Sequence, residues 1–298
     1  MNMSSRNGQI FVLIFLAFIW GTSFILMKRG LEVYTANQVA AMRIFISFLA
    51  LLPFAIKRLQ KFSVKMWIYI VIAGLFGSGI PAFMFTIAQQ HINSSMAGIL
   101  NALTPLFTLI IAVSFFRTKV FWYNVIGIIL GFFGAATLVI KDFSSILDGE
   151  NVYGLLIVFA TLLYGYNTNH VKNLLTGMNG LTITALAFFT IGPFAGIYLL
   201  FSGIEVPLSH PKALEALGYV AILAVAGTAF ALILWNTLIK KLTAIYASSV
   251  TYIIPVFAIM WGVIDGEEFA LREILSIALI FAGIYLVNRN SSKTNVTT

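Results

Sequence analysis

The chain carries an internal repeat, and this repeat constrains the fold more strongly than any other feature of the sequence. The stretch from Tyr69 to Val120 recurs 150 residues further on without a gap. The residues that match at this offset are Tyr69 and Tyr219, Ile72 and Ile222, Gly77 and Gly227, Phe85 and Trp235, Ala97 and Ala247, Pro105 and Pro255, Phe107 and Phe257, and Val113 and Val263. An offset that stays constant through two apolar segments and their connection predicts that the chain is built from two copies of one structural unit.

Composition indicates that these units lie in a membrane. Of the 298 residues, 60% are hydrophobic and 9% are charged, whereas a soluble domain carries about 25% charged residues. No cysteine is present, which excludes disulfides, thiolate metal sites and cysteine nucleophiles. The net charge of +8 would suit a nucleic-acid partner in a soluble protein. In a membrane protein it is better explained by lysine and arginine residues that set the topology, so we expect no nucleic-acid partner.

Ten segments are candidates to cross the membrane, which takes about 17–25 mostly apolar residues. They are Ile10–Met27, Ala36–Ile56, Met66–Ala88, Ser94–Phe116, Phe121–Ile140, Val152–Val171, Leu181–Phe201, Ala213–Ile239, Ala244–Ile264 and Glu273–Val287. We expect the first to be a retained helix and not a signal peptide, because its apolar run is long and no small-residue cleavage site follows it. The sequence therefore predicts an all-α membrane protein with ten transmembrane helices and no soluble domain.

Basic residues are distributed unevenly along the connections between these segments. The even-numbered connections and both tails hold 12 of the 18 lysines and arginines, and the odd-numbered connections hold 5. The remaining one, Arg43, lies within a predicted helix. Because basic connections stay on the cytoplasmic side, this distribution predicts that the N- and C-termini are both cytoplasmic.

Five helices in each repeat is an odd number, so the second repeat must lie upside down relative to the first. We place the repeats at residues 1–143 and 144–298. The charges agree, because the pair Gln90–His91, predicted outside, matches the pair Lys240–Lys241, predicted inside. Inverted repeats are typical of secondary transporters, which bind substrate between the repeats near the middle of the membrane.

Short motifs along the chain resemble those of a known family. The first half carries Trp20-Gly21-Thr22-Ser23-Phe24 and Lys28, then Ala41-Met42-Arg43, then Ala97 and Pro105, then Gly127, Gly131 and Gly134. The second half repeats this pattern more weakly with Tyr164-Gly165-Tyr166-Asn167, Lys172, Ala247, Pro255, Gly266-Glu267 and Gly283. Over almost the whole chain, their order and spacing resemble the EamA-type transporters of the drug/metabolite transporter superfamily. One departure is Arg117, which stands where this family usually has an acidic residue.

The resemblance implies a ten-helix carrier of the bacterial inner membrane, with a central cavity walled by helices 1, 3, 4, 6, 8 and 9. It also implies small substrates, typically amino acids, their analogues or other small metabolites, often moved outward.

Polar side chains within the membrane indicate where such a cavity would lie. Lipid offers no hydrogen bonds, so a polar group at this depth needs a partner or a water-filled cavity. Aromatic faces combined with a few amides suit a cavity for small amphiphilic molecules, and helix packing is the alternative. The candidates for substrate binding are Trp20, Ser23, Phe85, Asn101, Tyr164, Asn167, Trp235, Asn236, Thr251 and Tyr252.

Pro105 and Pro255 lie within matching predicted helices. Proline removes a backbone donor and disturbs the carbonyl four residues earlier, which for Pro105 is the carbonyl of Asn101. We expect kinks at both prolines, with hinges for a rocking motion as the alternative. A carbonyl freed at Asn101 would add a polar group to the cavity wall.

Four ionisable residues lie in or near the predicted helices. An embedded cation such as Arg43 costs at least ~2.5–3.5 kcal/mol unless it is paired. Backbone carbonyls on a loop are its expected partners, and a substrate carboxylate is the alternative. Lys28 and Lys172 end matching helices and are expected to extend to the membrane surface, with gate charges as the alternative. His170 is expected to be solvated at the inner surface and not to relay protons.

The favoured function is a secondary transporter for small organic metabolites that works by alternating access. The alternatives are a sugar or nucleotide-sugar-like exchanger and a non-transport membrane protein. A sugar nucleotide would need several cations in the cavity, and the sequence offers one. We do not expect an enzyme, because the chain shows no clustered acids, no metal-ligand spacing and no phosphate-binding loop.

We expect no cofactor and no metal. The predicted partners are a small-molecule substrate and the lipid bilayer, with the chain acting as a monomer or a homodimer. Gly127 and Gly131 form a GxxxG pair that suits a dimer face or, by default, packing within the chain.

Overall fold

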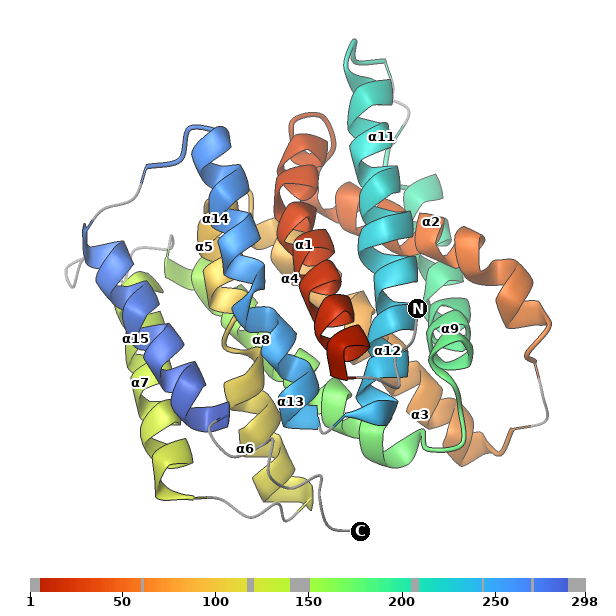
Figure 1. The fold of residues 1–298 in the computed structure, drawn as a ribbon. Coiled ribbons are helices and arrows are strands. Elements are labelled where there is room, and N and C mark those ends of the chain that lie inside the picture. Colours follow the sequence, from red (N-terminus) through yellow and green to blue (C-terminus); the bar gives the residue numbers. More distant parts are fainter. Residues whose placement is uncertain are drawn as a thin grey trace.

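The computed structural model describes residues 6–59, 62–116, 121–139, 151–204, 209–242, 244–268 and 271–288, which are almost entirely helical (Figure 1). No strand occurs within these ranges. The first half contains α1 (Arg6–Leu31), α2 (Ala36–Ile56), α3 (Val64–Gly74), η1 (Leu75–Gly79), α4 (Ile80–Ala88), α5 (Ser94–Asn101), α6 (Thr104–Phe116) and α7 (Trp122–Val139). The second half contains α8 (Asn151–Leu174), α9 (Gly180–Leu200), α11 (Ala213–Ala224), η3 (Val225–Phe230), α12 (Ala231–Lys241), α13 (Ala244–Ser248), η4 (Ser249–Tyr252), α14 (Ile254–Ile264) and α15 (Leu271–Asn288).

Each apolar segment predicted from the sequence coincides with a helical stretch. Six stretches are long and apolar enough to cross a membrane: Asn7–Leu31, Ala36–Ile56, Val64–Ala88, Ser94–Phe116, Gly180–Leu200 and Ala213–Lys241. Shorter apolar helices cover Trp122–Gly134, Val250–Ile264 and Ile274–Gly283. The all-helical fold is thus confirmed for the described residues, while the count of ten crossings and the cytoplasmic termini stay predictions.

Irregular turns occur at matching places in the two halves. The third helical stretch contains the π-helix η1 at 75–79, and its match contains the π-helix η3 at 225–230, which is the same offset of 150. The next stretch breaks between α5 and α6, directly before Pro105, and its match passes through the 3-10 turn η4 directly before Pro255. A proline cannot continue the preceding helical hydrogen bonds, so the expected kinks are present at both prolines.

The helix contacts also occur in matched pairs. Helix α1 packs on α14, as α8 packs on α6, and α1 packs on α11 and α12, as α8 packs on α3 and α4. Two further contacts, α2 with α9 and α7 with α15, join an element to its own match, and the contact of α5 with α14 is repeated by that of α13 with α6. Figure 1 shows α1 rising through the bundle while α8 descends, so these two matching helices run in opposite directions.

Two matching glycines allow close helix contacts. A Cβ on Gly21 of α1 would lie 2.5 Å from the Cβ of Phe257, and a Cβ on Gly165 of α8 would lie 3.0 Å from the Cβ of Phe107. Phe107 and Phe257 are themselves repeat matches, so the same contact occurs twice. These glycines let α1 approach α14, and α8 approach α6, without a side chain between them.

Two side-chain caps relate α2 to α9. Thr35 caps α2 through a capping box with Gln38, and Asn179 caps α9 by accepting a hydrogen bond from the backbone of Thr182. Asn or Thr before the first helical turn satisfies backbone N–H groups that lack a partner within the helix. The two caps are 144 residues apart, which is the offset that also relates Trp20 of α1 to Tyr164 of α8.

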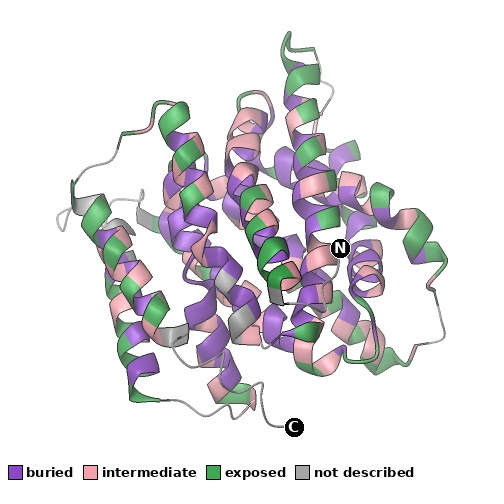
Figure 2. Cartoon of the chain, in the orientation of Figure 1, coloured by how far each residue is buried: buried purple, intermediate pink, exposed green. Residues whose placement is uncertain are grey.

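Buried residues gather in the centre of the bundle, and exposed residues lie on its outer faces (Figure 2). Phe11, Phe194 and Leu214 are among the exposed large side chains, as expected where lipid tails replace water. Gly283 of α15 lies against Gly127 and Gly131 of α7. The GxxxG pair therefore serves packing within the chain, the default expectation.

Candidate functional site

A cavity lies in the centre of the bundle, between elements of both halves. Its volume is about 90 Å³, measured as the space open to the centre of a water molecule. One water occupies about 10–15 Å³ on this measure, so the cavity suits a molecule of roughly six to nine non-hydrogen atoms. The lining residues are Trp20, Ser23, Phe24, Met27, Arg43, Gly77, Ser78, Phe85, Asn101, Thr104, Tyr164, Asn167, Thr168, Gly227, Leu232, Trp235 and Thr251.

Two aromatic pairs form matching walls of this cavity. The rings of Trp20 and Trp235 meet edge to face with centroids 5.5 Å apart, and those of Phe85 and Tyr164 stack at 6.0 Å. Trp20 matches Tyr164 and Trp235 matches Phe85, so one pair is the repeat copy of the other. Both distances lie in the range of favourable aromatic contacts.

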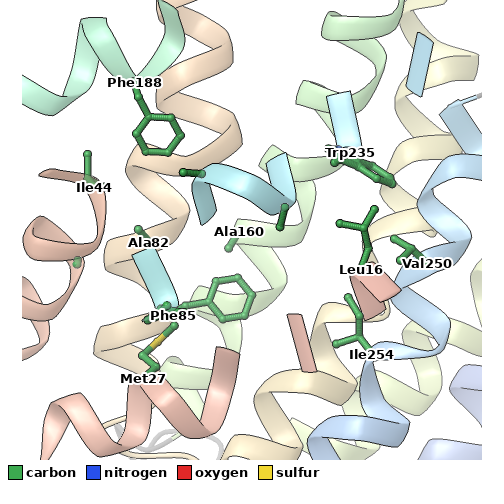
Figure 3. Close-up of a cluster of buried hydrophobic side chains, with 14 of the residues drawn as sticks. Leu16, Met27, Ile44, Ala82, Phe85, Ala160, Phe188, Trp235, Val250 and Ile254 are labelled. Atoms are coloured by element: carbon green, nitrogen blue, oxygen red, sulfur yellow. The ribbon is translucent and has the colours of Figure 1, made fainter. Parts of the chain in front are cut away.

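The aromatic walls continue into the apolar core. Figure 3 shows Phe85 next to Met27, and Trp235 projecting toward Leu16 and Val250. The indole Nε1 of Trp20 donates to the carbonyl of Gly227 in η3 at 3.1 Å. This bond satisfies the polar edge of the Trp20 ring and leaves its apolar face as cavity wall.

Arg43 projects from α2 into the cavity lining. Its Nε donates to the hydroxyl of Thr228 in η3 at 2.7 Å. The expected pairing with backbone carbonyls on a loop is therefore wrong, because the partner is a side chain and lies within a helical turn. Within the described ranges, every recorded carboxylate ion pair is made by Lys28 or Arg29, and none by Arg43.

Asn101 and Asn167 place buried amides at the cavity. Each residue is 7% exposed, and its Oδ1 has no hydrogen-bond partner in the structure. The backbone carbonyl of Asn101, by contrast, accepts a hydrogen bond from the Thr104 hydroxyl at 2.8 Å. Thr104 thus takes up the carbonyl that Pro105 was expected to free, and the side-chain Oδ1 of Asn101 is the polar group without a partner.

Two of the predicted residues lie outside the cavity lining. Asn236 lines a smaller adjoining pocket of about 20 Å³, where its Nδ2 donates to the Thr184 hydroxyl at 3.0 Å. Asn167 lines both the pocket and the cavity. Tyr252 is half-buried and packs against the core next to the cavity.

Sequence reasoning missed several lining residues, namely Phe24, Met27, Gly77, Ser78, Thr104, Thr168, Gly227 and Leu232. One signal would have found Ser78 together with Thr228, the partner of Arg43. Ser78 and Thr228 match at the offset of 150 and are hydroxyl residues in otherwise apolar helices. Their position within η1 and η3 agrees with the tendency of π-turns to occur at functional places.

At one end of the cavity, which we call the ion-paired end, charged residues join the two halves. Lys28 of α1 contacts Asp265 at 2.5 Å and Glu267 at 3.5 Å, and Arg29 also pairs with Asp265. Glu267 further accepts from the backbone N–H groups of Ser94 and Ser95 at 3.1 and 3.2 Å, and from the Ser95 hydroxyl at 2.5 Å. Lys28 is therefore part of a cluster and does not merely extend to the surface.

At the opposite end, which we call the lysine end, α8 and α12 finish side by side. The ammonium group of Lys172 donates to the carbonyl of Lys240 at 3.3 Å. Lys240 in turn donates to the carbonyls of Val171, at 3.2 Å, and Leu175. Both lysines thus bind the backbone at helix C-termini, where cations are favoured.

His170 lies one turn inside the lysine end. It is 1% exposed, and its Nε2 contacts the carbonyl of Tyr69 at 2.9 Å. The expectation that it is solvated is wrong, because the rings of Tyr69 and Tyr166 cover it.

The described residues contain no group of three or more His, Cys, Asp or Glu side chains that could hold a metal ion. The chemistry of the cavity is that of binding, by one guanidinium, aromatic faces, hydroxyls and amides.

A helical bundle with apolar outer faces, two like halves and an amphiphilic cavity between them has the build of a membrane transporter. The EamA-like transporter family matches residues 7–140 and again 152–289. The chain belongs to this family and is a multi-pass membrane protein.

Similar proteins agree with this assignment. An "Uncharacterized transporter" of Archaeoglobus fulgidus is 25% identical, over 91% of this chain and 95% of its own length. The "Uncharacterized inner membrane transporter YedA" of Escherichia coli is 25% identical, over 90% and 87%. The "Probable terminal-alkyne amino-acid exporter" of Streptantibioticus cattleyicolor is 21% identical, over 96% and 95%. A solved crystal structure has the same fold, with a TM-score of 0.68 at 16% identity over 97% of this chain and 100% of that chain.

Proposed function

We propose that this protein is a secondary transporter that exports amino acids or their analogues by alternating access around the central cavity. The observation that carries the proposal is the cavity itself. It lies between the two halves and combines one cation, uncommitted amide oxygens and two aromatic pairs. Such a lining suits a small molecule that has both charged and apolar parts.

The size of the cavity supports this substrate class over the alternatives. About 90 Å³ holds a molecule of roughly six to nine non-hydrogen atoms, which is the size of a small amino acid. A sugar nucleotide is several times larger and would need more cations than Arg43 provides. The amino-acid exporter among the similar proteins points in the same direction.

We further propose ten crossings, with two inverted repeats at residues 1–143 and 144–298 and both termini in the cytoplasm. The opposite directions of α1 and α8 and the matched contacts support inversion. The distribution of basic residues supports the orientation, which places the lysine end at the cytoplasm and the ion-paired end outside. Because the EamA-like relatives include an inner membrane transporter, we place the chain in the cytoplasmic membrane.

In this proposal the two halves rock against each other, and the breaks before Pro105 and Pro255 serve as hinges. Trp20, Ser23, Phe85, Asn101, Tyr164, Asn167, Trp235 and Thr251 would contact the substrate, and Asn236 and Tyr252 would support them from behind.

The test uses purified protein in liposomes loaded with a bacterial metabolite extract, with efflux followed by mass spectrometry. We expect selective loss of one or a few amino acids or analogues from wild-type liposomes, and none above background with Trp235→Ala. An imposed pH gradient tests coupling to protons in the same preparation. Efflux of sugars or nucleotides alone would overturn the proposal. So would the absence of selective efflux both without amino acids outside the liposomes and with them.

A further inference from the structure

The two halves of the cavity are related by the repeat, yet their polar groups differ. Arg43 lines the cavity from α2, and the offset of 144 that relates α2 to α9 places Ala187 at the matching position. Arg43 donates to Thr228, whose match is Ser78. Ala187 lines only the adjoining pocket of about 20 Å³, and Ser78 lines both this pocket and the cavity. The first half therefore places a guanidinium where the second half has only an alanine beside a small pocket.

The guanidinium of Arg43 is held through one nitrogen. Its Nε donates to the Thr228 hydroxyl, which itself donates to the carbonyl of Leu223 at 3.1 Å. Among the described residues no other hydrogen bond of the Arg43 side chain is found, so its two terminal NH₂ groups can bind a ligand in the cavity that Arg43 lines. Paired N–H groups in a plane match the two oxygens of a carboxylate and bind it more strongly than a neutral acceptor.

The buried amides also differ between the two halves, but here the unmatched groups are hydrogen-bond acceptors and not donors. The matches of Asn101 and Asn167 are Thr251 and Ser23, whose hydroxyls both donate to carbonyls of their own helices. The amide oxygens of Asn101 and Asn167 have no donor, although both residues are more than nine-tenths buried. Buried acceptors without donors are costly, so a ligand that brings N–H groups is favoured here.

We propose that Arg43 determines specificity by binding the carboxylate of the substrate, while the amide oxygens of Asn101 and Asn167 bind its ammonium group. The inference rests on the proposed function and adds the orientation of the substrate in the cavity. Arg43 and Thr228 bring the carboxylate to the side of η3, and Asn101 and Asn167 bring the ammonium group to the side of α5 and α8.

This arrangement selects against molecules that carry only one of the two charges. A free amine would add a cation to a cavity that already contains Arg43, with no carboxylate to offset it. An acid without an amino group would leave both amide oxygens without a donor. The site therefore accepts the zwitterion and rejects both of its fragments.

The test begins with liposomes loaded with the twenty standard amino acids together with a terminal-alkyne amino acid, and efflux names the best substrate among these probes. Binding of three compounds to the purified wild-type protein is then measured by calorimetry: that amino acid, the amine that lacks its carboxylate, and the acid that lacks its amino group. We expect each fragment to bind about 10- to 100-fold more weakly than the amino acid, the range for losing one charge-assisted hydrogen-bonding group.

The variants Arg43→Met and Arg43→Lys test the residue itself. Arg43→Met should weaken binding of the amino acid about 10- to 100-fold while leaving the amine unchanged or tighter. Arg43→Lys keeps the charge and should recover part of the loss, because an ammonium group lacks the planar pair of donors. Arg58→Met is the matched control. Arg58 lies just past the end of α2 and does not line the cavity, yet it also donates through Nε to a threonine, Thr182.

The outcomes separate this inference from the proposed function. No efflux of any amino acid would overturn the proposed substrate class and the inference with it. If an amino acid is transported but the amine that lacks its carboxylate binds the wild-type protein equally well, only the inference is overturned. This result does not depend on whether any variant folds. Equal binding by wild type and a folded Arg43→Met variant would do the same.

Discussion

At the ion-paired end of the bundle, four charged side chains join the two halves, whereas at the lysine end two ammonium groups reach only backbone carbonyls. The two ends are repeat matches, because Lys28 matches Lys172 and the connection after α14 matches the one after α6. The difference comes from the acids. Glu267 and Asp265 have no acidic counterpart in the first half, where Arg117 and Phe115 stand, and Arg117 lies outside the described residues.

This difference predicts unequal strength at the two ends. A hydrogen bond to a charged group contributes about 1.5–3 kcal/mol, and Glu267, whose side chain is 5% exposed, accepts from three groups besides Lys28. A lysine at a helix C-terminus contributes about 0.3–1 kcal/mol. In the proposed transport cycle, the ion-paired end should therefore open less readily than the lysine end.

The largest effect is expected from Glu267→Gln, which removes the charge that faces both Lys28 and the N-terminus of α5. Because the chain has no cysteine, a Ser23→Cys reporter in the cavity can be labelled with a maleimide that does not cross membranes. We expect labelling from the ion-paired end to become about tenfold faster or more, following the loss of one charge-assisted contact. Glu268→Gln, at the exposed neighbour, is the control, and an unchanged rate in Glu267→Gln would show that this end is not held by Glu267.

A smaller effect is expected from Asp265→Asn, read out with the same reporter. Asp265 pairs with Lys28 and Arg29, whose side chains are 36% and 39% exposed, so solvent screens both pairs. We expect labelling from the ion-paired end to rise about two- to fivefold, corresponding to roughly 0.5–1 kcal/mol. An effect as large as that of Glu267→Gln would mean that the ion pairs, and not the helix N-terminus, set the strength of this end.

A further, similarly small effect is expected at the lysine end from Lys240→Met. The change removes donors to the end of α8, so labelling from this side should rise about two- to fivefold, the range for a cation at a helix C-terminus. Lys241→Met, at the exposed neighbour, is the matched control. A tenfold rise at this end would reverse the predicted order of strength.

The smallest effect is expected from Glu32→Gln at the surface of the ion-paired end. Glu32 pairs with Arg29 at 2.6 Å, and both side chains are 39% exposed. Exposed ion pairs three residues apart contribute about 0.2–0.5 kcal/mol, so labelling should change about twofold or less. A larger change would extend the ion-paired cluster to Glu32.

The sequence alone predicted the helices, the repeat and much of the cavity wall. Trp20, Phe85, Tyr164 and Trp235 were found because they are repeat matches within the membrane and aromatic faces beside amides suit such a cavity. Asn101 was placed at the cavity because an amide inside a membrane needs a hydrogen-bond partner or a water-filled cavity.

The side-chain contacts between distant helices could not be predicted from the sequence. Nothing in the sequence indicated that Arg43 would contact Thr228, which lies 185 residues away, or that Lys28 would contact Asp265. His170 looked like a surface residue until the rings of Tyr69 and Tyr166 were found to cover it. These contacts depend on how helices pack, and helix packing does not follow from the period of any one helix.

What the sequence determined by itself is the class of structure: apolar segments of membrane length must be helical, since lipid leaves backbone groups no other partner. It also determined that the two halves are alike. Only the tertiary structure decided where the halves differ. Arg43 lines the cavity where its match, Ala187, lines a small adjoining pocket, and carboxylates pair with cations at one end where backbone carbonyls do so at the other. Side chains from distant helices meet there, and their pairing depends on distances that no local pattern records.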